Sequence, residues 1–204
     1  MENITQIPVP SLFNPYDPNA ASTETPAEAK NGHPSVFYAL LFQNVSNAKE
    51  LKAKVIAGDP ELPQCVMVNP ALVLSSFQLQ TACSRAYMNQ AQNNMKTKTI
   101  LSEILFSLSP SLNIAESMKL FGLSDNSNSI FVLVPSADDA SVDETTINKL
   151  KNLVQGDLSP AHSFSDLTDL KLLKKVYKLN DAVDQSNTVL EDLIVGGIAT
   201  KGFL

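Results

Sequence analysis

The chain has 204 residues, of which 44% are hydrophobic and 18% are charged, a composition typical of a globular protein with a buried core. Its formal net charge of −6 excludes a protein that coats nucleic acid through a basic surface, although it allows a local basic groove. Two cysteines, no signal-peptide pattern and no apolar run of roughly 18 residues exclude a disulfide-rich secreted fold and a membrane helix, so we expect an intracellular protein.

The first part of the chain differs from the rest. Residues 1–33 are rich in proline, asparagine, serine and threonine, and they hold too little apolar surface to offset the entropy lost on ordering. We therefore expect a disordered, proline-rich tail over residues 1–33 and a single domain over residues 34–204.

The elements of the domain follow from apolar spacing and from helix start and stop signals. Strands are predicted at residues 35–43, 65–68 and 130–134, with a short edge strand within 158–164. Helices are predicted from Ser46 to Gly58, over 70–90, over 101–108, from Asn113 to Gly122, from Ser141 to about 154, over 167–179 and over 188–199. So few strands exclude a doubly wound sheet. The order predicts an α+β fold, a small mixed sheet covered by helices as a two-layer sandwich, with a helical insertion.

Residue types that perform catalysis or bind metals are sparse. His33 and His162 are far apart in sequence and neither neighbours a cysteine, so we predict no metal site. Cys65 and Cys83 fall on predicted core positions, which indicates buried, unreactive thiols. Glu103 enters an apolar helix and is interpreted as an ion-pair partner of Lys98. The sequence also lacks a glycine-rich phosphate loop, and we predict no catalytic residue and no cofactor.

Two surface features remain. Arg85, Lys96 and Lys98 can form a compact basic patch, and Tyr87 and Tyr177 near the basic segments offer stacking surfaces for nucleic-acid bases. Charge alone favours the simpler interpretation, a solvated face.

The last predicted helix carries an apolar stripe that includes Leu190, Leu193 and Ile194, and it also contains Gly196 and Gly197. Glycine weakens a helix by about 1 kcal/mol relative to alanine, so its presence indicates that another backbone approaches closely. That backbone belongs either to this chain or to a partner.

Several motifs, in order and spacing, resemble the TPRKB family. They are Asn69-Pro70, Phe77-Gln78, Lys96 to Ile100, Glu103 to Phe106, Leu108 to Pro110, Asn113-Ile114, Phe121 to Asp125, Lys174 to Leu179 and the terminal Thr200-Lys201. The resemblance covers residues 34–204.

This resemblance implies a non-catalytic α/β subunit of KEOPS, the complex that makes threonylcarbamoyladenosine in tRNA. The family binds the PRPK-like kinase subunit, supports its ATPase activity and helps to recruit tRNA through its 3′ end. Carried over to this sequence, it implies tRNA contact by Arg85, Lys96, Lys98 and Thr99. It implies a kinase interface at Leu190, Leu193 and Ile194. It also implies a location in cytoplasm and nucleus, with neither a membrane nor a small molecule as a target.

Two alternatives stay open at this point. The chain could be a stand-alone RNA-binding adaptor outside KEOPS, or a cryptic hydrolase that uses Cys83 or Glu103. The sequence disfavours the hydrolase, because no base, oxyanion site or metal ligand accompanies either residue.

Overall fold

The structure is a computed structural model, and it describes residues 4–8, 36–136, 144–160, 164–179 and 186–202. Residues 9–33 of the predicted tail, His33, His162 and the predicted helix cap at Ser141 lie outside the described residues.

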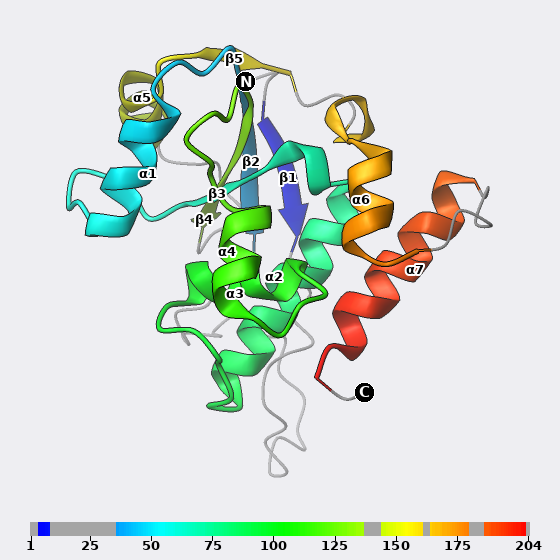
Figure 1. The fold of residues 1–204 in the computed structure, drawn as a ribbon. Coiled ribbons are helices and arrows are strands. Elements are labelled where there is room, and N and C mark those ends of the chain that lie inside the picture. The colour runs from blue at the N-terminus through cyan, green and yellow to red at the C-terminus, as the bar shows by residue number, and fades with distance from the viewer. Residues whose placement is uncertain (1–3, 9–35, 137–143, 161–163, 180–185, 203–204) are drawn as a thin grey trace, which may run out of the picture.

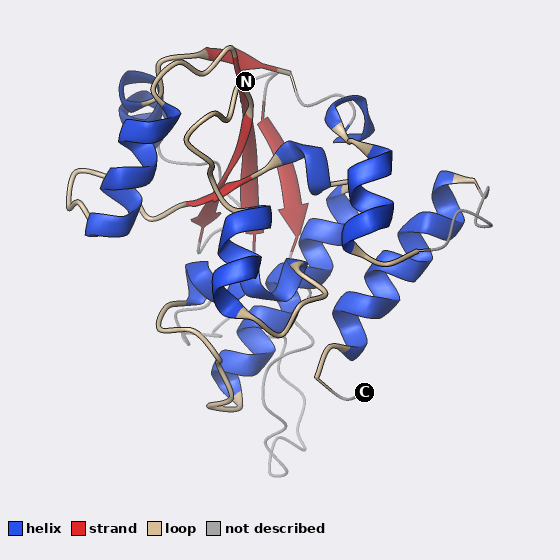
Figure 2. Ribbon diagram, viewed as in Figure 1, coloured by secondary structure: helices blue, strands red, loops and turns tan. Residues whose placement is uncertain are grey.

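Five strands form one sheet at the centre of the molecule (Figure 2). They are β1 (Ile4–Pro8), β2 (Val36–Gln43), β3 (Val66–Val68), β4 (Ile130–Ser136) and β5 (Asp157–Ser159). The order is β1-β2-β4-β3, and β5 pairs with the end of β2. The predicted α+β class is confirmed. The sheet was predicted to be mixed, whereas each ladder formed by the described residues is antiparallel.

Strand β1 differs from the predicted disordered tail at residues 4–8, the only part of residues 1–33 that the structure describes. Residues 4–8 pair with β2 in antiparallel register, from Ile4 opposite Leu40 to Pro8 opposite Val36. Ile7 is fully buried. The proline content hid this strand, but Pro8 is tolerated because it lies at the end of a strand with only one described neighbour.

Helices cover both faces of the sheet, so the molecule has three layers and not the predicted two (Figure 1). Strand β2 shows the physical reason. All its residues except the last are buried, and its alternate side chains enter two separate cores. Phe37 and Leu41 enter the larger core, whereas Tyr38 and Phe42 enter the smaller one. A continuously apolar strand is typical of a sheet with both faces covered.

The helices divide unequally between the two faces. The smaller core packs under α1 (Ala48–Ala57) and α5 (Glu144–Leu153). The larger core packs under α2 (Ser76–Ala91), α3 (Ile100–Leu108), α4 (Ile114–Phe121), α6 (Leu170–Val176) and α7 (Asn187–Thr200). Helices α2 to α4 lie between β3 and β4 in the chain and correspond to the predicted helical insertion.

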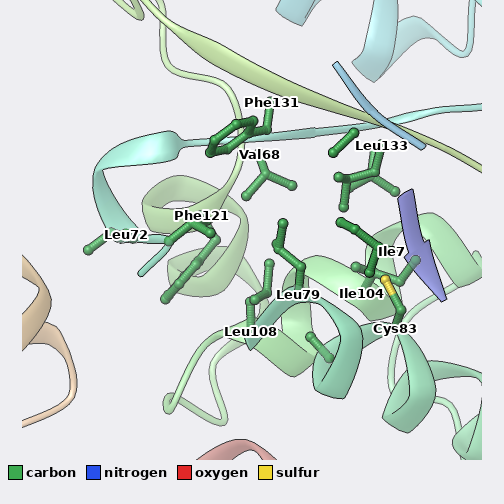
Figure 3. Packing of buried hydrophobic residues seen from close by; sticks show 14 of the residues in the cluster. Ile7, Val68, Leu72, Leu79, Cys83, Ile104, Leu108, Phe121, Phe131 and Leu133 are labelled. Atoms are coloured by element: carbon green, nitrogen blue, oxygen red, sulfur yellow. The ribbon is translucent and has the colours of Figure 1, made fainter. Parts of the chain in front are cut away.

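Figure 3 shows the larger core at close range, with Ile7 of β1, Leu133 of β4, Ile104 of α3 and Cys83 of α2 directed into the same space. Cys83 is fully buried, and burial raises its thiol pKa far above the ordinary value. Burial likewise raises the pKa of Cys65 to about 12. Both thiols are therefore buried as predicted, and neither forms a thiolate nucleophile near neutral pH.

The helix predicted over residues 70–90 is interrupted. A 3₁₀ turn, η2 (Pro70–Leu72), is followed by an extended segment, and α2 begins only after its cap at Ser75. The buried Gln78 side chain stabilises this break, because it accepts from the Leu74 backbone N–H at 2.7 Å and donates to the Leu72 carbonyl at 3.0 Å. A second 3₁₀ turn, η3 (Phe164–Leu167), precedes α6.

Candidate nucleic-acid and protein interfaces

The basic segment predicted to contact tRNA lies in the loop between α2 and α3. Lys96 and Lys98 are exposed on this loop. The Thr99 hydroxyl caps α3 by accepting from the Ser102 backbone N–H at 3.2 Å. Arg85 lies on α2, six residues before that helix ends at Ala91, and its side chain donates to the Ala199 carbonyl at the end of α7. Arg85 and Lys96 therefore line the same pocket, whereas Lys98 is exposed outside it.

That pocket has a volume of about 420 Å³, within the range of small-ligand sites. Three cationic side chains line it, from Arg85, Lys96 and Lys201. Its apolar lining comes from Phe106, Leu112 and Ile114. Leu112 is 69% exposed and Ile114 is 40% exposed, so this apolar surface is open to solvent. A lining of cations and apolar groups suits a ligand with both negative charge and a flat ring.

Lys201 was missed as a site residue by sequence reasoning, which placed it only in a terminal motif. Its ammonium donates to the Phe106 carbonyl and lies 3.3 Å from the centroid of the Phe106 ring. Burial and the positive charge of Arg85 lower the pKa of Lys201 to about 7. No local signal could identify this residue, because its partner is 95 positions away in sequence.

Arg85 connects the pocket to the C-terminal end of α7. Its guanidinium donates to the Ala199 carbonyl at 2.5 Å and also to the Lys201 carbonyl. These carbonyls lie at a helix end, where the last C=O groups have no partner within the helix and a positive charge is favourable. Arg85 therefore has a structural role in holding α7, besides lining the pocket.

Glu103 does not pair with Lys98 as predicted. Its carboxylate is fully buried and accepts from the Asn89 side-chain amide at 2.9 Å. It also accepts from the backbone N–H groups of Lys96 at 3.0 Å and Thr97 at 2.9 Å, and from the Thr97 hydroxyl at 2.8 Å. Two of these donors are backbone N–H groups, which leave no mark in the sequence.

Of the two tyrosines that were interpreted as stacking surfaces, Tyr87 is buried and Tyr177 is partly buried against the larger core. Tyr87 is 7% exposed and lies with its ring centroid 6.0 Å from that of Phe37. Tyr177 packs edge-on against Phe121 at 6.2 Å, and its hydroxyl donates to the Leu108 carbonyl at 2.5 Å. Both rings therefore pack against other aromatic rings of the chain and do not form the predicted exposed stacking surface.

The predicted kinase-interface residues fall on two different faces of α7. Leu190 and Ile194 are 2% and 0% exposed and belong to the larger core, together with Ile198. Leu193 is 44% exposed. Figure 1 shows α7 at the edge of the molecule, where it packs beside α2. In this conformation only Leu193 of the three predicted residues is available to a partner.

We call the exposed side of α7 its outer face, formed by Leu193, Gly196, Gly197 and Thr200, which share one side of the helix at spacings of three, four and seven residues. Apart from its chain neighbours and the nearby backbone of α7 itself, a Cβ atom added at either glycine would meet no described atom within 4 Å. Close packing within the described part of the chain therefore does not explain the glycines.

The described residues show neither a metal centre nor a membrane span. They contain no group of three or more His, Cys, Asp or Glu side chains arranged to hold a metal ion. None of the helices there has the length and apolarity needed to cross a bilayer.

Comparison with known proteins gives consistent matches over the domain. Residues 42–202 match the family described as kinase binding protein CGI-121. The chain is 32% identical over 162 residues to the EKC/KEOPS complex subunit TPRKB of Danio rerio, a match that covers 79% of this chain and 89% of the relative. It is 31% identical over 165 residues to the EKC/KEOPS complex subunit CGI121 of Yarrowia lipolytica, covering 79% and 91%. The corresponding subunit of Schizosaccharomyces pombe is 30% identical over 171 residues, covering 81% and 93%.

Proposed function

Because the chain belongs to the family of CGI-121 kinase-binding proteins, we propose that it is a non-catalytic KEOPS subunit that binds a kinase-like subunit through the outer face of α7. The observation that carries this proposal is the outer face itself. Leu193 is exposed, and it lies on the same side of α7 as Gly196 and Gly197, which no other described part of the chain covers. An apolar side chain and an accessible stretch of backbone are therefore adjacent on this face. The inner face of α7 is already used by the core.

The direct test is purification of the tagged full chain from its source cells, followed by mass spectrometry. We expect a kinase-like ATPase and further KEOPS subunits in the eluate, and both cytoplasmic and nuclear fractions should yield them. A complete set of partners without any kinase-like protein would refute the proposal.

We further propose that the chain helps to recruit tRNA for threonylcarbamoyladenosine synthesis by holding the 3′ end at the pocket between α2, α3 and α7. Arg85, Lys96 and Lys201 would contact phosphates, and the apolar lining around Phe106 would contact a base. Lys98 and Thr99 would contact the RNA backbone further from the pocket.

The same pocket is compatible with a stand-alone RNA-binding adaptor. Equal tRNA affinity with and without the kinase-like subunit would favour that alternative.

The glycines of the outer face give a prediction in which two measurements move in opposite directions. The double substitution Gly196→Ala, Gly197→Ala should raise the free energy of unfolding of the isolated chain by roughly 1 kcal/mol per site, because alanine is the better helix former and its Cβ meets no clash. The same change should weaken kinase binding by about tenfold, because a partner backbone packed on the glycines is displaced. Urea unfolding and calorimetric titration measure the two effects.

Gly122→Ala is the control that shows whether a glycine-to-alanine change raises the free energy of unfolding only where the added Cβ meets no clash. A Cβ there would lie 2.5 Å from the Met118 carbonyl oxygen, so this variant should be destabilised. Kinase affinity that stays unchanged in the Gly196, Gly197 variant would show that the partner does not touch this part of α7.

Lys201 predicts a pH dependence of tRNA binding. In the free protein its pKa is about 7, lowered by burial and Arg85, so the side chain loses its charge as the pH rises through 7. A nearby phosphate favours the charged form, and binding therefore takes up a proton. Affinity should fall from pH 6 to pH 8, by at most about tenfold per pH unit for one proton, when fluorescence anisotropy is measured at constant ionic strength.

Lys98→Arg keeps a charge outside the pocket and should show the same pH profile as the wild-type chain. Lys201→Arg carries a permanent charge and should flatten the profile. An unchanged slope in Lys201→Arg would exclude Lys201 as the titrating group.

A further inference from the structure

The buried carboxylate of Glu103 is not explained by packing alone. The residue is fully buried on α3, a helix whose other buried residues include Ile104, Phe106 and Leu108. An ionised carboxylate is unfavourable in such a place unless it is fully hydrogen-bonded, and an apolar side chain of similar size avoids this cost. A carboxylate at this position therefore indicates that its hydrogen bonds have a role other than stabilising the folded chain.

These hydrogen bonds connect one point of α3 to the whole basic loop. One carboxylate oxygen accepts from Asn89, near the end of α2. The other accepts from two successive backbone N–H groups, those of Lys96 and Thr97, and from the Thr97 hydroxyl. The backbone from which the Lys96 side chain extends toward the pocket is thus held to the core. The Lys96 ammonium then donates to Asn94 at 2.9 Å.

The charge of Glu103 acts against an anionic ligand. Burial lowers the pKa of Arg85 and of Lys201, and the nearby charge of Glu103 acts in the opposite direction on both. A negative charge beneath a cationic pocket should repel phosphate, so removing it should strengthen RNA binding if charge alone mattered. Loss of the loop's anchor should weaken binding. The charge of Glu103 and its anchoring of the loop therefore predict opposite changes in RNA affinity when the carboxylate is removed.

We propose that Glu103 is a positioning residue for RNA binding, whose buried carboxylate fixes the 96–99 loop so that Lys96 is presented to the pocket. This inference rests on the proposed contact between the pocket and tRNA. It assigns no chemical step to Glu103, which reaches the RNA only through the loop.

The test is Glu103→Gln in the full chain, with an unmodified tRNA transcript ending in CCA as the probe. A neutral amide replaces charge-assisted hydrogen bonds with weaker ones, so affinity should fall by roughly fivefold to tenfold. Hydrogen exchange at the Lys96 and Thr97 amides should accelerate in the same variant. Equal or tighter tRNA binding, or unchanged exchange at both amides, would overturn the inference.

Two further variants separate this role from general destabilisation. The double variant Glu103→Gln, Asn89→Asp returns a carboxylate to the buried pair and should recover part of the affinity. Glu116→Gln is the matched control. Glu116 is an exposed carboxylate on α4 that accepts from the Ser111 hydroxyl, which precedes this helix, and it has no hydrogen bond to the 96–99 loop among those of the described residues. It makes the same change in net charge and should not weaken tRNA binding.

The outcomes also distinguish this inference from the proposed function. If Lys96→Glu with Lys98→Glu weakens tRNA binding but Glu103→Gln does not, the RNA contact stands and the positioning role fails. If the wild-type chain does not bind the transcript at low salt, both fail.

Discussion

Leu193→Glu should reduce the affinity for the kinase-like subunit by about 100-fold or more and leave the fold intact. Leu193 is 44% exposed on the outer face of α7, so an ionised carboxylate is tolerated there in the free chain. In the complex the same carboxylate is removed from water against an apolar partner, and an unpaired buried charge costs several kcal/mol. Calorimetric titration of the purified chain with its kinase-like subunit measures the loss.

The control for this substitution is Ile56→Glu. Ile56 is 76% exposed, lies on α1 and is separated from α7 by the sheet. It should bind the kinase-like subunit with wild-type affinity. The buried neighbours Leu190 and Ile194 are unsuitable, because a charge at either would disrupt the core and imitate a lost interface. Wild-type affinity in a folded Leu193→Glu variant would contradict the assignment of the interface to α7.

Lys96→Glu combined with Lys98→Glu should weaken tRNA binding by at least about tenfold and reduce its dependence on salt. Each lysine that contacts a phosphate releases counterions on binding, so removing two contacts lowers the slope of log K against log salt. Both side chains are exposed, and the loop is held through backbone N–H groups, so the fold should be retained. Filter binding at several salt concentrations checks both quantities.

Lys52→Glu with Lys49→Glu provides a control of equal charge change on α1, far from the pocket in the fold. If this control lowers tRNA affinity as much as the loop variant, the attraction is diffuse and the pocket has no special role. A loop variant with unaltered affinity and slope would remove the basic loop from the RNA contact.

The features of the fold that depend on neighbouring residues were predictable. The apolar runs of β2 and β4, the glycine stop of α1 at Gly58 and the asparagine cap of α4 all lie where the sequence placed them. The Asn113 side chain, for example, accepts from the Glu116 backbone N–H at 3.1 Å. Periodicity and capping depend on residues a few positions apart, and both are visible in one sequence.

The features that depend on distant contacts were not predictable. Strand β1 is ordered by its pairing with β2. The second helical layer covers the face of β2 whose side chains enter the smaller core. The pocket forms only because Arg85 and Lys201 meet across 116 positions in sequence. An apolar stripe likewise shows that α7 is partly buried, but it cannot tell that Leu190 faces the core and Leu193 faces solvent.

The most direct test of the account is hydrogen exchange of the chain, measured by mass spectrometry with and without its kinase-like subunit. We expect the protection gained on binding to concentrate in α7, around Leu193 to Gly197, while α1 around Val55 and Ile56 exchanges as in the free chain. Protection that appears on α1 and is absent from α7, or no complex at all, would contradict it.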